Sequence, residues 1–192
     1  KINMKNIIQS IIYTLAGLAS LGWISIYLII RSVSDPGPDS NIVAFFDDKI
    51  IADENYENLG FESFAEISTN FFTELFFHMN LTLIIFTTTM TIAWSVVSHY
   101  LNIDAPGKAK IYALHWLVFS GIFVGSIFGI VWYFTGTTMY STADLIGTGG
   151  HVWIYSMSLI IYVLPYYLGV LLGTARFARS SVLFANKLPG GF

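Results

Sequence analysis

The chain alternates between long apolar runs and short polar connections. Four runs are each long enough for a helix that rises about 1.5 Å per residue to cross a hydrocarbon layer roughly 30 Å thick. A membrane interior holds no water to satisfy backbone groups, so such runs are expected to be helices. The pattern predicts an all-α integral membrane protein, a single membrane domain over residues 1–192, with spans at about 7–30, 71–97, 111–134 and 152–173.

The first apolar run has a second possible interpretation. It follows Lys1 and Lys5, a pattern that also fits a cleaved signal peptide. The run is longer than the roughly 7–15 apolar residues of a signal peptide, and the residues after Arg31 make a poor cleavage site. We therefore expect a retained transmembrane helix.

Basic residues near the spans predict the orientation, because cytoplasmic loops are enriched in Lys and Arg. The connections after the first and third spans hold only Arg31 and Lys49, whereas the termini and the 101–110 loop hold Lys1, Lys5, Lys108, Lys110, Arg176, Arg179 and Lys187. We expect both termini on the cytoplasmic side of the cell's inner membrane. The polar 32–70 segment is then external, and it carries most of the acidic residues: Asp35, Asp39, Asp47, Asp48, Asp53, Glu54, Glu57, Glu62 and Glu66.

Composition supports a bilayer environment and excludes several kinds of chemistry. Hydrophobic residues make up 55% of the chain and charged residues 11%, against roughly 25% charged residues in soluble domains. The absence of cysteine excludes disulfides, iron–sulfur clusters, thiolate zinc sites, cysteine nucleophiles and covalently attached c-type haem. The small net charge of −3 excludes a broad basic surface for nucleic acid.

Glycines in the third span recur at intervals of four residues, at Gly121, Gly125 and Gly129. This spacing puts them on one helix face and predicts close approach of a neighbouring backbone or a flat cofactor. The fourth span repeats the spacing with Gly169 and Gly173, and Pro165 should disturb the helix one turn before it.

The histidines divide into two layers under this topology. His78 and His151 lie at the outer side, whereas His99 and His115 lie at the inner side. Each layer holds two histidines on different helices, as b-type haem with two axial imidazoles requires. A helix places His78 and His99 about 31 Å apart, a long separation for electron transfer between two haems. A single haem and unliganded histidines near the membrane surface are the alternatives.

Glu74 is the only carboxylate within a predicted span, and it precedes His78 by one turn. Ionisable groups inside a membrane are costly and are candidates for function. A carboxylate–imidazole pair can accept a proton as a quinol is oxidised, so Glu74 is the expected proton acceptor. Two alternatives stay open: a metal site completed by Asp144 and His151, and a carboxylate that is simply hydrated in the headgroup layer.

Short motifs in the last two spans resemble the di-haem b-type cytochrome anchors of bacterial respiratory enzymes, such as the membrane subunits of formate dehydrogenase and hydrogenase. The similarity lies in Leu114-His115-Trp116 with the helix end Thr135-Gly136, and in His151-Val-Trp-Ile-Tyr with Leu164-Pro165 and Gly169. It covers about 50 residues, and the arginine often found before the His-Trp pair is absent. The resemblance implies that His115, and less strongly His151, ligates haem iron.

These observations favour a membrane subunit of a respiratory-type complex that carries haem b and transfers electrons to or from a quinol. His78 and His151 would ligate an outer haem, and His99 and His115 an inner one. One alternative is a non-catalytic structural subunit of a larger membrane assembly, whose glycine faces contact other subunits. Another is an integral-membrane metalloenzyme subunit that uses Glu74, His78, Asp144 and His151.

Overall fold

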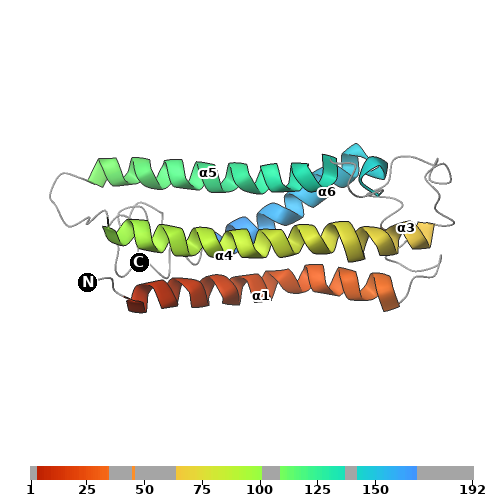
Figure 1. Cartoon of the computed structure of the whole chain (residues 1–192), viewed down its shortest axis with the longest axis horizontal. Helices are drawn as coiled ribbons and strands as arrows, with labels where there is room; N and C mark the ends of the chain where they lie inside the picture. The colour runs from red at the N-terminus through yellow and green to blue at the C-terminus, as the bar shows by residue number, and fades with distance from the viewer. Residues whose placement is uncertain (1–3, 35–44, 46–63, 101–108, 137–141, 168–192) are drawn as a thin grey trace. The chain divides into compact units, whose positions relative to one another are not determined.

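A computed structural model describes residues 4–34, 45, 64–100, 109–136 and 142–167, and these residues are almost all helical (Figure 1). Helix α1 is Met4–Ser34. A second continuous helical stretch consists of α3 (Phe64–Asn70), the π-helix η2 (Phe71–Phe76) and α4 (Phe77–Tyr100). It is followed by α5 (Ala109–Gly136), the 3₁₀ turn η3 (Ala143–Leu145), α6 (Thr148–Ser158) and the π-helix η4 (Leu159–Val163).

Three of these helices are long and apolar enough to cross a membrane. The qualifying stretches are Ile11–Ser34, Glu66–Trp94 and Leu117–Gly136. They correspond to the first three predicted spans, with the second beginning several residues earlier than the apolar run suggested. The fourth predicted span is helical from 148 to 167, and its remainder lies outside the described residues, as does most of the acidic 32–70 segment.

The irregularity predicted at Pro165 takes the form of the π-helix η4, which ends two residues before the proline. Proline lacks an N–H, and its ring collides with the carbonyl four residues earlier in a regular α-helix. A wider π-turn moves that carbonyl away from the ring, so the helix continues to residue 167 instead of ending.

The chain divides into two compact units, which are described separately. Unit 1 comprises Lys1–Leu21, Ile84–Ser126 and Ile161–Phe192, whereas unit 2 comprises Gly22–Leu83 and Ile127–Ile160. Helices α1, α4 and α5 therefore contribute residues to both units.

In unit 1 the core is a column of aromatic rings. Phe123 of α5 stacks on Phe86 at a centroid distance of 5.7 Å and on Tyr166 at 3.8 Å, and both Phe123 and Tyr166 are fully buried. Helix α1 joins this core through Thr14, whose hydroxyl donates to the Thr91 hydroxyl at 3.4 Å. Such polar contacts hold helices together in lipid, where apolar burial gives little drive for association.

The core of unit 2 is a phenylalanine cluster around η2. The rings of Phe71, Phe72 and Phe76 lie 5.0–5.9 Å apart, and all three are buried. Polar contacts to α1 flank the cluster: the Ser25 hydroxyl donates to the Asn80 side-chain oxygen at 3.3 Å, and Thr69 donates to the Ser32 carbonyl at 3.3 Å.

The glycine face of α5 makes no close contact with the described chain. Gly121, Gly125 and Gly129 are all exposed, and a Cβ added at any of them meets nothing within 4 Å. The close approach predicted at this face is therefore not provided by described residues of the chain itself. Gly169 and Gly173 lie outside the described residues.

Candidate functional site

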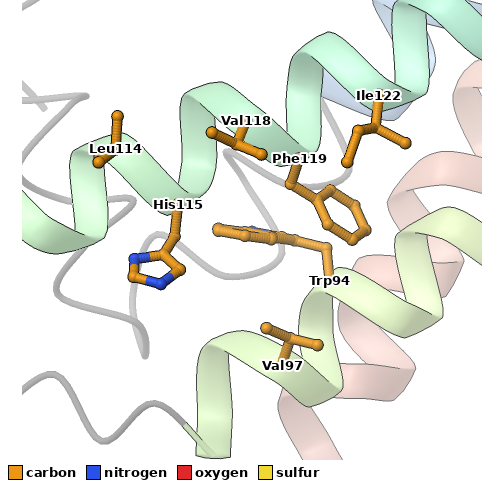
Figure 2. Close-up of a pocket in the computed structure, with 7 residues that line it drawn as sticks. All are labelled: Trp94, Val97, Leu114, His115, Val118, Phe119 and Ile122. Atoms are coloured by element: carbon orange, nitrogen blue, oxygen red, sulfur yellow. The ribbon is translucent and has the colours of Figure 1, made fainter.

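His115 lies at a pocket of about 360 Å³ within unit 1 (Figure 2). Helix α4 contributes Trp94 and Val97, and the lining from α5 is Leu114, His115, Val118, Phe119 and Ile122. The spacing explains the arrangement, since residues three, four and seven positions apart share one face of a helix. The result is an almost wholly apolar pocket with two nitrogen-bearing rings, the indole of Trp94 and the imidazole of His115.

The indole of Trp94 forms the centre of the pocket wall. It extends from α4 toward α5, with His115 and Phe119 on either side of it (Figure 2). Its centroid is 5.0 Å from that of Phe119, at an interplanar angle of 45°. Trp94 is only 1% exposed, and its Nε1 has no hydrogen-bond acceptor among the described residues. A buried donor without an acceptor costs on the order of 1–3 kcal/mol, so this N–H requires an explanation.

The pocket lies where two candidate spans have their ends. Trp94 is the last residue of the stretch Glu66–Trp94, and His115 comes two residues before Leu117–Gly136 begins. The side chains over its mouth, such as Val118 and Ile122, are more than half exposed.

A second polar feature occurs in unit 2, where η2 meets α4. The Nδ1 atom of His78 lies 2.7 Å from the Glu74 carbonyl oxygen, which also accepts the backbone N–H of Phe77. A carbonyl can only accept, so Nδ1 carries the proton, and in the neutral imidazole Nε2 carries the lone pair. This contact orients the His78 ring and favours the tautomer with the proton on Nδ1. Both Glu74 and His78 are exposed.

The other predicted site residues are more dispersed. His151 is half-buried in α6, and Asp144 is exposed in η3, both within unit 2. His99 belongs to α4, but its side chain lies outside the described residues. Among the residues that the structure describes, no group of three or more His, Asp or Glu side chains could hold a metal ion. The metalloenzyme alternative, which needs Glu74, His78, Asp144 and His151 together, therefore receives no support.

Two features of this region were not expected from the sequence. The aromatic partners of His115, Trp94 and Phe119, come from a long apolar background in which single aromatic residues do not stand out. One signal was available, because an indole N–H in an apolar run needs an acceptor when it is buried. The π-turn before His78 has no counterpart in the sequence pattern.

Comparison with known proteins provides no relative for this chain: no protein-family model, no curated protein and no solved structure matches it. The similarity of its last two spans to di-haem cytochrome anchors remains a prediction from the short motifs.

Proposed function

We propose that this chain is a membrane subunit of a respiratory-type complex that carries b-type haem and transfers electrons to or from a quinol. The observation that carries the proposal is the bond of His78 Nδ1 to the Glu74 carbonyl at 2.7 Å. Histidines that ligate metals commonly donate their other ring N–H to a carbonyl in this way, which fixes the ring and makes it a stronger ligand.

The proposed outer haem would use residues of unit 2. An axially bound haem needs two imidazoles from different helices, and unit 2 supplies His78 on α4 and His151 on α6. The haem iron, when bound, supplies one-electron oxidation and reduction. His78 would bind and orient it, and Glu74, exposed one turn earlier, would take up the proton that quinol oxidation releases. An inner haem between His99 and His115 remains a prediction from the layered histidines.

The proposal includes a topology. Four spans would put both termini in the cytoplasm and the acidic 32–70 segment outside, as the basic residues predict. The proposed partners are the lipid bilayer, a quinol and other membrane subunits of the complex.

A second candidate function rests on the glycine face of α5. Because Gly121, Gly125 and Gly129 are exposed and meet no neighbour in the described chain, they favour a structural subunit that packs against other subunits. Bound haem separates the two functions, since a purely structural subunit needs none.

The deciding experiment is the visible absorption spectrum of the purified full chain. Haem b should be present, and His78→Ala should remove the signal of the outer haem or convert it to high spin, because the iron loses one strong axial bond; this is about half of the total if both haems exist. Ile85→Ala is the control, since Ile85 is an exposed apolar residue on the same helix. If the inner haem exists, His115→Ala removes the other half. A wild-type protein without a haem spectrum would exclude the electron-transfer function and favour the structural subunit.

A further inference from the structure

Buried polar atoms without a hydrogen-bond partner are concentrated in unit 1. Among the described residues there are five such side-chain atoms, and four belong to this unit: Thr87 Oγ1, Trp94 Nε1, Ser120 Oγ and Tyr166 OH. All four residues are at most 5% exposed. In native proteins nearly every buried polar group is hydrogen-bonded, either to protein or to ordered water. Four such atoms in one unit therefore indicate a partner other than the described side chains.

Thr87 is the most informative of the four, because a threonine within a helix has an acceptor one turn earlier in its own backbone. The hydroxyls of five other threonines donate to the carbonyl four residues before them, at 2.7–2.9 Å: Thr73, Thr82, Thr89, Thr91 and Thr135. The hydroxyl of Thr87 has no partner among the described residues, although Leu83 precedes it in the same helix. Thr87 is fully buried, so its hydroxyl forgoes the local acceptor within the interior of the unit.

The three hydroxyl groups lie beside the column of aromatic rings that forms the core of unit 1. The ring of Phe123 in α5 stacks on Phe86 of α4 and on Tyr166. Thr87 follows Phe86 directly, and Ser120 precedes Phe123 by one turn on the same buried face of α5. Each hydroxyl is therefore carried by a residue that belongs to this column or adjoins one of its members.

Helix α1 packs against the same part of the unit. A Cβ added at Gly17 would lie 2.9 Å from the Cβ of Pro165, the residue before Tyr166. Thr14, one turn earlier in α1, donates to the Thr91 hydroxyl at 3.4 Å, and Thr91 donates to the Thr87 carbonyl at 2.9 Å. Segments of α1, α4, α5 and the helix around Pro165 thus pack together here, and in such a close-packed interior a shared partner must be small.

We propose that unit 1 binds water inside its helix bundle, with the hydroxyls of Thr87, Ser120 and Tyr166 as partners. A buried water typically makes about three hydrogen bonds, and each hydroxyl can donate as well as accept. Bound water would link α4, α5 and the helix of Tyr166 through polar contacts, which hold helices together in lipid. Trp94 lies two turns along α4 from Thr87, roughly 10 Å, and is not part of this site. The inference is independent of the proposed haem and quinol.

A double-mutant cycle tests whether Thr87 and Tyr166 share a partner. Thr87→Val and Tyr166→Phe keep the shape of each side chain and remove its hydroxyl. Each variant should lower the folding equilibrium constant of the purified full chain about threefold to tenfold, measured by unfolding in dodecyl sulfate, because a hydrogen bond to water is lost. The double variant should lose little more than the weaker single variant, because both changes remove the same water. Thr89→Val and Tyr133→Phe are matched controls at exposed positions and should stay within about twofold of wild type.

The sign of the effect is decisive. A buried hydroxyl that has no partner at all can be replaced by an apolar group of the same shape with no loss of stability, or with a gain. Unchanged or increased stability of Thr87→Val and Tyr166→Phe would therefore overturn the proposal. Losses that simply add in the double variant would also overturn it, because the two hydroxyls would then have separate partners.

Radiolytic labelling distinguishes bound water from a direct bond between the two hydroxyls. A short X-ray pulse splits water into hydroxyl radicals, which modify the side chains next to it, and mass spectrometry locates the modified residues. Phe123 should be modified well above Phe76, a ring of the same type that is 1% exposed against 0% for Phe123. The modification of Phe123 should fall to the level of Phe76 in the Thr87→Val, Tyr166→Phe double variant. Equal modification of the two rings in the wild-type protein would overturn the water site.

Discussion

The contact between Gly17 and Pro165 gives a sharp test of packing in unit 1. A Cβ built on Gly17 of α1 lies 2.9 Å from the Cβ and 3.3 Å from the Cα of Pro165. Ordinary contacts of this kind fall at 3.4–4 Å. The proline ring is stiff and is held by the helix that continues from η4, so the neighbour cannot yield by rotating a flexible side chain. Gly17→Ala must therefore move a backbone.

The magnitude follows from two opposing effects. Replacing glycine by alanine within a helix stabilises it by up to about 1 kcal/mol. Forcing an extra methyl group into a closely packed contact costs roughly 1–3 kcal/mol. Gly22 of the same helix is the matched control, because a Cβ there meets nothing within 4 Å and only the helical gain applies. The helical gain cancels between the two variants, so Gly17→Ala should be less stable than Gly22→Ala by about 1–3 kcal/mol.

The assay is unfolding of the detergent-purified protein by increasing dodecyl sulfate, followed by circular dichroism. Gly22→Ala should unfold at or slightly above the wild-type midpoint, and Gly17→Ala clearly below it. Equal midpoints for the two variants would show that α1 and the Pro165 helix do not approach as closely as described, and the polar contacts of α1 in unit 1 would need to be tested in turn.

Two further predictions concern membrane orientation and assembly. A reporter fused after Lys187 should be cytoplasmic, and one inserted near Asp53 should be external. If the Asp53 reporter were cytoplasmic, the proposed topology would be inverted. The pocket at His115 would then lie at the outer side of the membrane. Gly125→Leu should reduce recovery of the chain with its partner subunits while leaving the isolated chain as stable as wild type, because a Cβ at Gly125 meets nothing within the described chain. Ile122→Leu, an exchange between similar apolar residues, is the control. Unimpaired recovery of Gly125→Leu would mean that the glycine face contacts lipid.

The sequence predicted most of the architecture because apolar length is a direct physical requirement for crossing a bilayer. The first three spans are present as helices, with ends that differ by a few residues. The second stretch begins at Glu66, earlier than the apolar run suggested, because the helix itself already begins at Phe64 in α3. The termini of the helices depend on such contacts, and contacts between distant segments are not visible in hydropathy.

The candidate sites were predictable only in part. His115 stood out as a histidine within a span, but its partner Trp94 is one aromatic residue among many, and only three-dimensional packing brings the two rings to one pocket. Glu74 and His78 were correctly placed one turn apart, yet their contact runs through the backbone carbonyl of Glu74, and Glu74 lies in the π-helix η2. A π-turn depends on small energy differences between backbone arrangements, and residue type gives little indication of it.

The few buried positions of α1 have a consequence for how this helix tolerates change. Among the residues of α1 whose burial is described, only Thr14, Leu18, Ser25 and Ser32 are buried, and three of them carry hydroxyl groups. The outward positions, such as Ile12, Trp23 and Ile30, are exposed apolar side chains that lipid accepts in almost any apolar form. Substitutions between apolar residues should therefore be tolerated over most of the surface of α1. Substitutions at the buried hydroxyl residues Thr14, Ser25 and Ser32 should be tolerated poorly. A helix of equal hydrophobicity that lacked those hydroxyls would still insert into the membrane, but it would lose the polar contacts that turn one of its sides toward Asn80 and Thr91.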